Sequence, residues 1–144
     1  MGLVFLLLLA TLACSQKKSA QDYFNEGAKC FEKGEFDRAI EFYNKGIAQA
    51  PGSAVGYNLL GMAYRFKFNQ SGKKEWRDKE IESFKKSIEL EPDFVPALVN
   101  LGATFYYSGD KKKAASYFKH ALEVMPNHPE AEQLKKMIVE GSEE

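Results

Sequence analysis

A regular spacing of glycines and prolines is the feature that most constrains how this chain can fold. Gly27 and Gly61 are 34 residues apart, and so are Pro92 and Pro126. A fixed period of this length indicates a repeat architecture, in which each unit buries its apolar face only against its neighbours. The chain has 144 residues, enough for one continuous core and too few to favour two domains. We therefore expect a single domain built from stacked units.

Small and large residues recur within the period in the order of a helical hairpin. The small residues Gly27, Gly61, Gly102, Ala39 and Ala114 let paired helices approach closely, and large aromatic residues fill the remaining space. The pattern resembles the tetratricopeptide repeat (TPR), whose consensus is W-x2-L-G-x2-Y, then A-x3-F, then P. The matching positions are Tyr23, Glu26, Gly27, Cys30, Ala39, Tyr43 and Pro51; Tyr57, Leu60, Gly61, Tyr64, Glu80, Phe84 and Pro92; and Leu98, Leu101, Gly102, Phe105, Ala114, Phe118 and Pro126.

The resemblance implies an all-α fold, a TPR solenoid of three helical hairpins plus a C-terminal capping helix. The spacing places the TPR domain at residues 20–140, with repeats at about 20–53, 54–94 and 95–128, the capping helix at 128–140 and a frayed tail at 141–144. Gly34 and Gly109 suit the left-handed residue that ends a first helix. Asp110 is placed to cap the helix that follows.

The second repeat is longer than the other two. Pro51 and Pro92 are 41 residues apart, and the surplus of seven lies between Tyr64 and Phe84. We expect this insertion to widen the turn inside the hairpin. Residues 65–77 hold the only tryptophan among basic and aromatic residues, so the segment could extend a binding surface or lie on anionic lipid. We favour a longer first helix and a polar loop whose aromatic side chains pack back on the hairpin.

An apolar run precedes the repeats. Residues 3–12 are apolar apart from Thr11, and ten residues are too few to span a hydrocarbon layer, which takes roughly 20 in a helix. They indicate a lipoprotein-type signal peptide over residues 1–13. Residues 9–14 resemble a bacterial lipobox, which implies that Cys14 is lipidated and that residues 14–19 form a linker of about 20 Å. The alternative is an ordinary cleaved signal with an incidental cysteine.

Charge and motif content argue against catalysis and against nucleic-acid binding. The 20 Lys and Arg residues equal the 20 Asp and Glu residues, so the chain lacks the net positive field that nucleic acids attract. His120 and His128 lack the spacing of metal ligands, and no nucleophile elbow, P-loop or dinucleotide fingerprint occurs. Cys30 replaces the tyrosine of the repeat and is expected to be buried. We expect no enzyme, no cofactor and no metal.

The resemblance also implies a binding groove. In TPR stacks the first helices line a concave face, into which residues three before, one after and four after the conserved glycine point. Chaperone-binding TPRs carry a Lys and an Asn of a carboxylate clamp where this chain has Phe24 and Ala28. We therefore expect an apolar helix or extended segment of a protein partner. The implied groove residues are Phe24, Ala28, Phe31, Asn58, Met62, Arg65, Val99, Asn100, Ala103 and Tyr106.

These features together predict a non-catalytic protein–protein interaction module, anchored to a membrane through acyl chains on Cys14. Its expected place is the bacterial cell envelope, at the outer membrane rather than the inner, where it docks a partner for assembly of an envelope complex. The alternative is a soluble periplasmic or secreted adaptor. A self-associating structural protein, a homo-oligomer whose concave face is filled by another copy, is also open.

Overall fold

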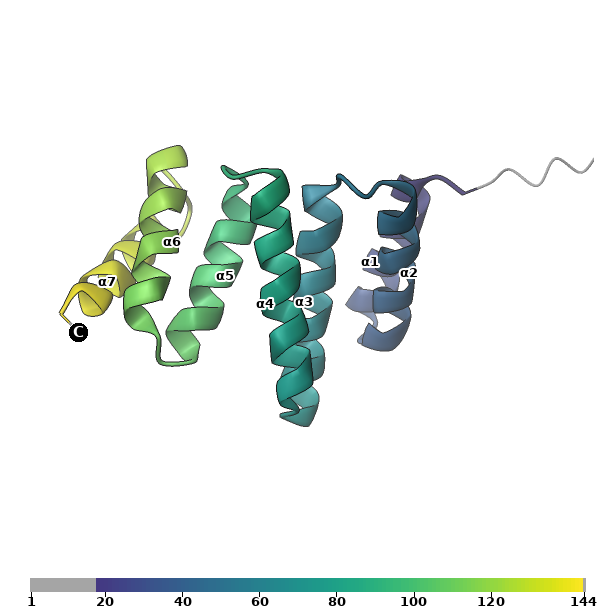
Figure 1. The fold of residues 1–144 in the computed structure, drawn as a ribbon, viewed down its shortest axis with the longest axis horizontal. Coiled ribbons are helices and arrows are strands. Elements are labelled where there is room, and N and C mark those ends of the chain that lie inside the picture. The colour runs from purple at the N-terminus through teal and green to yellow at the C-terminus, as the bar shows by residue number, and fades with distance from the viewer. Residues whose placement is uncertain (1–17, 144) are drawn as a thin grey trace, which may run out of the picture.

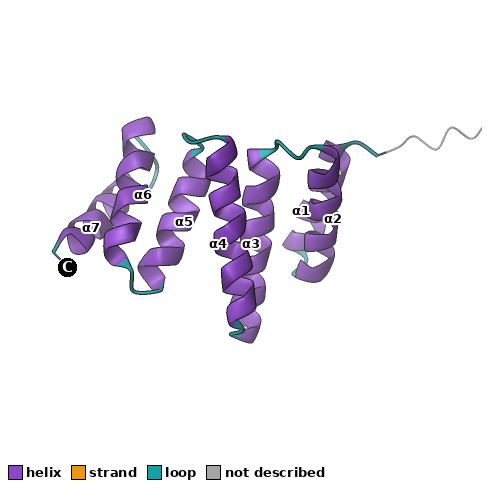
Figure 2. Cartoon of the chain, viewed as in Figure 1, coloured by secondary structure: helices purple, strands orange, loops and turns teal. Residues whose placement is uncertain are grey.

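The protein is a row of helical hairpins. The structure, a computed structural model, describes residues 18–143, and this part of the chain contains helices and no strand (Figure 2). Three antiparallel hairpins stand side by side, and a last helix closes the C-terminal end (Figure 1). The predicted all-α solenoid of three hairpins plus a closing helix is confirmed. The helices are α1 (Ala20–Glu32), α2 (Phe36–Gln49), α3 (Ala54–Ser71), α4 (Lys74–Leu90), α5 (Val95–Tyr107), α6 (Lys111–Val124) and α7 (Ala131–Ser142).

The turns within the first and third hairpins follow the predicted chemistry. Gly34 and Gly109 have φ angles of 75° and 90°, the left-handed conformation in which an L side chain is strained. The carboxylate of Asp110 accepts a hydrogen bond of 3.1 Å from the Lys113 amide and so caps α6. At the start of α1, Ser19 and Asp22 form a reciprocal capping box. These local signals fix where α1 begins and where the two turns fall.

The close approach of paired helices explains the small residues of the repeat. A Cβ atom on Gly27 would lie 2.4 Å from the Tyr43 ring, and one on Gly102 would lie 2.5 Å from the Phe118 ring. These two rings are 1% and 0% exposed, so they have no room to move aside. Each glycine is therefore required by the aromatic residue that packs on it.

The apolar core falls into two main clusters along the row. The first surrounds Tyr43 and joins α1, α2 and α3, with Leu60 and Ala63 contributed by α3. The second surrounds Phe84 and Phe118 and joins α4 to the last three helices. Each hairpin thus buries its apolar stripe against the next one, as a solenoid requires.

The insertion lengthens both helices of the second hairpin, and the expected widened turn is wrong. Helices α3 and α4 have 18 and 17 residues, whereas α1 and α5 have 13 and α2 and α6 have 14. The loop between α3 and α4 is only Gly72 and Lys73, because Gly72 takes a φ of 65° and ends α3 abruptly. The polar loop is therefore absent, although Trp76 does pack back on Tyr64 with 5.8 Å between ring centroids.

The closing helix lies slightly later than expected. We predicted it over residues 128–140, followed by a frayed tail, but α7 runs from Ala131 to Ser142. Gly141 is buried, and a Cβ atom there would lie 2.3 Å from the backbone oxygen of Lys111. Close packing of α7 on the start of α6 therefore holds residues that we expected to fray.

The N-terminal predictions fall outside the part of the chain that the structure describes. Residues 1–17, which include the signal and Cys14, are not among the described residues. Within residues 18–143, no helix has both the length and the apolar character needed to cross a bilayer. In Figure 1 the described chain enters α1 on one side of the row, and the tip of the long hairpin of α3 and α4 points to the opposite side.

Candidate protein-binding groove

The predicted groove residues lie on the first helices of the three hairpins, α1, α3 and α5. Most are apolar side chains that stay partly exposed, as a contact surface requires. Phe24 and Asn58 differ from the others because they are buried, each 6% exposed. The partly exposed members are Ala28, Phe31, Met62, Arg65, Val99, Asn100, Ala103 and Tyr106.

Phe24 belongs to the core and is not available to a partner. A Cβ atom on Gly46 or Gly56 would lie 2.4 or 2.6 Å from its ring, so the ring fills the space that these two glycines leave. Its cluster includes Tyr43 and Ile47. The prediction of Phe24 as a groove residue is wrong, because the glycines of α2 and α3 draw the ring inward.

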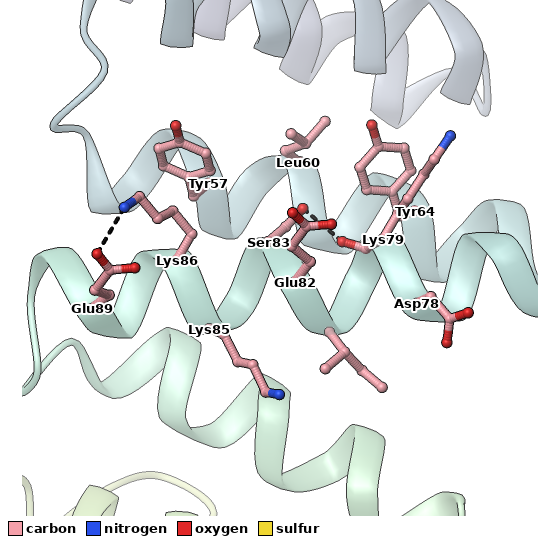
Figure 3. Close-up of a pocket in the computed structure, with 11 residues that line it drawn as sticks. Tyr57, Leu60, Tyr64, Asp78, Lys79, Glu82, Ser83, Lys85, Lys86 and Glu89 are labelled. Atoms are coloured by element: carbon pink, nitrogen blue, oxygen red, sulfur yellow. Dashed lines mark hydrogen bonds and ion pairs between the residues drawn. The ribbon is translucent and has the colours of Figure 1, made fainter.

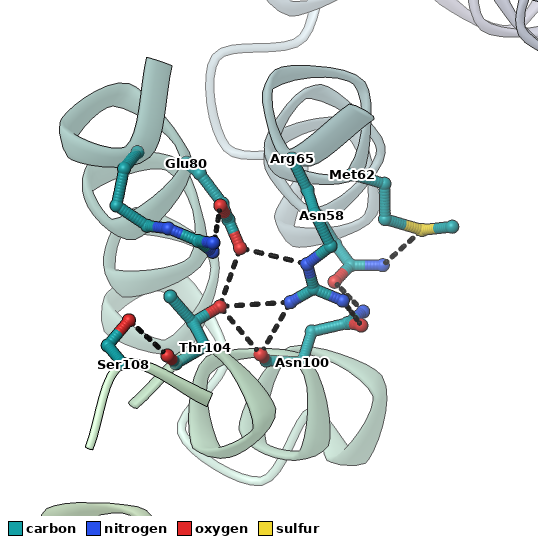
Figure 4. Close-up of polar contacts among 8 residues, drawn as sticks. Asn58, Met62, Arg65, Glu80, Asn100, Thr104 and Ser108 are labelled. Carbon is teal, nitrogen blue, oxygen red and sulfur yellow. Dashed lines mark hydrogen bonds and ion pairs between the residues drawn. The ribbon is translucent and has the colours of Figure 1, made fainter. Parts of the chain in front are cut away.

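Arg65 lies at the centre of a polar network that joins the second and third repeats (Figure 4). Its Nε donates to Glu80 at 2.8 Å, and its Nη2 donates to the Asn100 carbonyl at 2.6 Å and to Thr104 Oγ1 at 2.9 Å. Its Nη1 donates to Asn100 Oδ1 at 3.0 Å. The guanidinium also lies 5.0 Å from the centroid of the Phe84 ring. Arg65 therefore connects α3, α4 and α5.

Glu80 is the buried anion of this network. Its side chain is 0% exposed, and its two oxygens accept hydrogen bonds from Arg65, from Arg77 Nη1 at 2.6 Å and from Thr104 Oγ1 at 2.6 Å. A buried carboxylate is stable only when it is paired and hydrogen-bonded in this way. We did not single out Glu80 from the sequence. The signal was present, since Glu80 stands where the other two repeats have Ala39 and Ala114.

The two asparagines of the groove bond to each other. Asn100 Nδ2 donates to Asn58 Oδ1 at 3.0 Å, and Asn58 Nδ2 contacts Met62 Sδ at 3.9 Å. Both asparagines are among the groove residues that the TPR resemblance implies. Because Asn58 is buried and already bonded to Asn100, only Asn100 has a partly exposed amide at this point. The polar side chains of the groove thus mostly form hydrogen bonds between repeats.

Tyr106 marks the C-terminal end of the groove. Its hydroxyl donates to Glu140 of α7 at 2.5 Å, and Lys111 Nζ lies 3.6 Å from the same carboxylate oxygen. The hydrogen bond from Tyr106, followed by the charge of Lys111, lowers the pKa of Glu140 below its ordinary value. The closing helix therefore reaches the end of the groove and fixes the Tyr106 side chain.

An aromatic cluster marks the other end, near the turn of the first hairpin. The rings of Phe31, Phe36 and Phe66 contact one another with centroid distances of 5.0 to 5.3 Å. Phe66 is 40% exposed and lies on α3 at the point where the shorter first helices α1 and α5 end. In the same region Lys67 pairs with Asp37 at 2.9 Å. The lengthened helix thus supports the first hairpin and adds aromatic surface beside Phe31.

A separate cleft lies between α3 and α4 (Figure 3). Its volume is about 800 Å³, and Tyr57, Leu60 and Tyr64 line it from a different face of α3 than Met62 and Arg65. Charges of both signs surround it, so it does not favour an ionic ligand of one sign. The charged lining residues are Asp78, Lys79, Glu82, Lys85, Lys86 and Glu89.

The histidines have ordinary surface contacts. His120 Nε2 lies 2.8 Å from Asp93 Oδ1, and His128 Nδ1 accepts from the Glu130 amide at 3.1 Å. Among residues 18–143, no group of three or more His, Cys, Asp or Glu side chains is placed to hold a metal ion. Cys30 is buried, as predicted.

Comparison with known proteins supports the repeat assignment. Residues 95–128 match the family model described as tetratricopeptide repeat. The Photosystem I assembly protein Ycf3 of Rippkaea orientalis (strain PCC 8801 / RF-1) is 26% identical over 141 residues, which cover 85% of this chain and 77% of that protein. The antiviral innate immune response effector IFIT1 of Homo sapiens is 28% identical over 124 residues, covering 75% of this chain and 26% of that protein.

Solved structures show the same fold. The first TPR of Spaghetti (RPAP3), bound to HSP90 peptide SRMEEVD, superposes with a TM-score of 0.71 at 24% identity, covering 83% of this chain and 90% of that chain. The crystal structure of MamA gives a TM-score of 0.65 at 29% identity, covering 78% of this chain and 61% of that chain. Residues 95–128 therefore match a tetratricopeptide repeat, and the chain folds as a TPR solenoid.

Proposed function

We propose that this protein binds a segment of a partner protein along the groove formed by α1, α3 and α5. The main observation behind this proposal is that apolar side chains remain partly exposed on these three helices, each of which is the first of its hairpin. They include Ala28, Met62 and Ala103. Arg65, the charged residue of the groove, is bonded to the buried Glu80. The groove thus offers mainly apolar contact, which suits an apolar helix or an extended segment.

A binding role is also supported by the structural neighbours. TPR domains of similar fold were solved with HSP90 and HSP70 peptides bound. We propose a non-catalytic role for this chain, because the titratable side chains at the centre of the groove are engaged in hydrogen bonds within the protein. The binding energy would come from the partly exposed apolar side chains of α1, α3 and α5 and from the aromatic cluster of Phe31, Phe36 and Phe66 at one end of the groove.

Photo-crosslinking at single sites tests the groove. A crosslinking amino acid at Met62 or Ala103 should capture one defined partner in the source cells, whereas the same residue at Lys85 or Ser116 should not. The two control positions are exposed and lie on the second helices α4 and α6. Crosslinks of equal yield from Lys85 and Ser116, with none from the groove sites, would reject the groove as the binding surface.

The membrane anchor is a second part of the proposal. We infer from the lipobox-like residues 9–14 that acyl chains on Cys14 hold the domain at the bacterial cell envelope, since two lipid signals suffice for stable anchoring. Wild type and Cys14→Ala should be compared for radiolabelled palmitate incorporation and for partitioning into the detergent phase. Label and detergent partitioning should both disappear in the variant. Absence of label in the wild type would leave a soluble exported adaptor as the favoured alternative.

A further inference from the structure

We infer that Glu80 is a specificity determinant of the groove. Its buried carboxylate binds the Arg65 guanidinium from within the protein and thereby keeps acidic partner segments out. The inference rests on the proposed function of the same groove and specifies the chemistry of the partner, which must not be acidic where it crosses α3 and α5. It concerns a buried residue that does not itself touch the partner but compensates the charge of Arg65, which is partly exposed in the groove.

The hydrogen bonds of Arg65 leave little capacity for a ligand. A guanidinium has five N–H donors. In Arg65, four of them donate hydrogen bonds to Glu80, Asn100 and Thr104. The Arg65 side chain is only 23% exposed. An approaching carboxylate would find one remaining donor and would meet the negative charge of Glu80 directly behind the guanidinium. Both effects oppose the binding of an acidic side chain or a C-terminal carboxylate.

Packing alone does not explain a glutamate at this position. The first and third repeats place Ala39 and Ala114 here, and both alanines are 0% exposed in well-packed hairpins. A fully buried carboxylate carries a large desolvation cost, and apolar residues commonly replace buried ion pairs without loss of stability. The hairpin therefore does not need the charges of Glu80, Arg65 and Arg77 in order to pack. Its direct effect is on the electrostatics of the groove.

Removing the charge of Glu80 should therefore change which peptides bind. Glu80→Gln keeps the shape of the side chain and an oxygen that can accept from Arg65 Nε, but it leaves Arg65 and Arg77 without an anion. The probe is the fluorescently labelled acidic peptide SRMEEVD, and binding to the full-length chain is followed by fluorescence anisotropy. Two variants serve as controls. Glu82→Gln makes the same charge change at an exposed site on α4, and Glu80→Asp keeps the charge.

We expect Glu80→Gln to bind SRMEEVD at least about tenfold more tightly than wild type, Glu82→Gln and Glu80→Asp. The gain should weaken as salt is raised and should disappear in Glu80→Gln combined with Arg65→Gln. Equal affinity of Glu80→Gln and Glu82→Gln would overturn the inference. So would a gain that survives the loss of Arg65, since the added affinity would then come from another cation.

A second variant keeps the test decisive if Glu80→Gln does not fold, as judged by circular dichroism. Glu80→Ala combined with Arg77→Leu removes one of the two cations that lose their anion and leaves Arg65 as the uncompensated charge. This variant should also bind SRMEEVD more tightly than wild type. Failure of this inference is distinct from failure of the proposed function. Groove crosslinks at Met62 without a gain in peptide affinity would reject only the role of Glu80, whereas crosslinks from Lys85 and Ser116 alone would reject the groove itself.

Discussion

For the substitution Glu80→Ala, the repeat pattern and the structure predict opposite changes in the stability of the protein. Alanine is the residue of the other two repeats at this position, so the repeat pattern predicts a gain in stability, by about 0.5–2 kcal/mol for substitutions of this kind. The structure predicts the opposite. Loss of the carboxylate leaves Arg65 and Arg77 without their anion, although their side chains are only 23% and 18% exposed, and removes one of the two acceptors of the Thr104 hydroxyl.

The magnitude follows from the burial of the two cations. Removing one partner of a buried ion pair typically costs about 3–5 kcal/mol, and partial exposure of both guanidinium groups places this case near the lower end. We expect the free energy of unfolding to fall by about 3 kcal/mol. For a domain of this size, that corresponds to a decrease of about 10 °C in the thermal midpoint.

Urea unfolding followed by circular dichroism at 222 nm measures the change, with thermal unfolding as a second assay. The matched control is Glu82→Ala on the same helix, where the side chain is exposed and the expected change is within about 0.5 kcal/mol. Adding Arg65→Leu and Arg77→Leu to Glu80→Ala should recover most of the lost stability, because no buried charge then remains unpaired. A Glu80→Ala protein as stable as wild type would refute the reasoning.

Three further predictions concern packing, backbone and pH. Gly102→Ala should lower the unfolding free energy by about 1–3 kcal/mol in urea titrations, because the new methyl group would meet the immobile Phe118 ring at 2.5 Å; a neutral result would contradict the close packing. Gly72→Ala should cost about 1 kcal/mol, through its φ of 65° alone, since its position is open; an increase in the thermal midpoint would exclude strain there. Burial raises the pKa of Tyr43 to about 12, so the unfolded chain deprotonates first and stability should fall as the pH rises from about 10 to 12. Tyr43→Phe should show a smaller loss of unfolding free energy between pH 9 and 11.5 than wild type, and equal losses would argue against this assignment.

Much of the fold could be predicted because its signals are local. The 34-residue period, the positive-φ glycines Gly34 and Gly109 and the capping residue Asp110 each act through their immediate neighbours, and all appear as expected. The insertion could not be placed in the same way. Its length was evident, but whether the residues form a loop or more helix depends on Gly72 ending α3 within one residue, a choice that the repeat pattern does not encode.

The groove was harder to predict because it depends on contacts between repeats. Phe24 occupies a position that faces the concave side in the family, yet two glycines from α2 and α3 open space for its ring in the core. The partners of Arg65 lie up to 39 residues away in the sequence, beyond any local pattern. One signal of this network was present in the sequence: Glu80 is a charged residue at a position where the other two repeats have alanine.

The network around Glu80 also bears on how such a protein can evolve. Repeat arrays commonly lengthen by duplicating a unit, which requires each unit to fit any neighbour. Here the acid of the second repeat depends on Asn100 and Thr104 of the third through Arg65, so the two units form a matched pair. A copy of the second repeat placed beside the first, or at the end of the row, would bring in a buried acid without its full set of partners. The second and third units can therefore be copied or exchanged only together, as a pair.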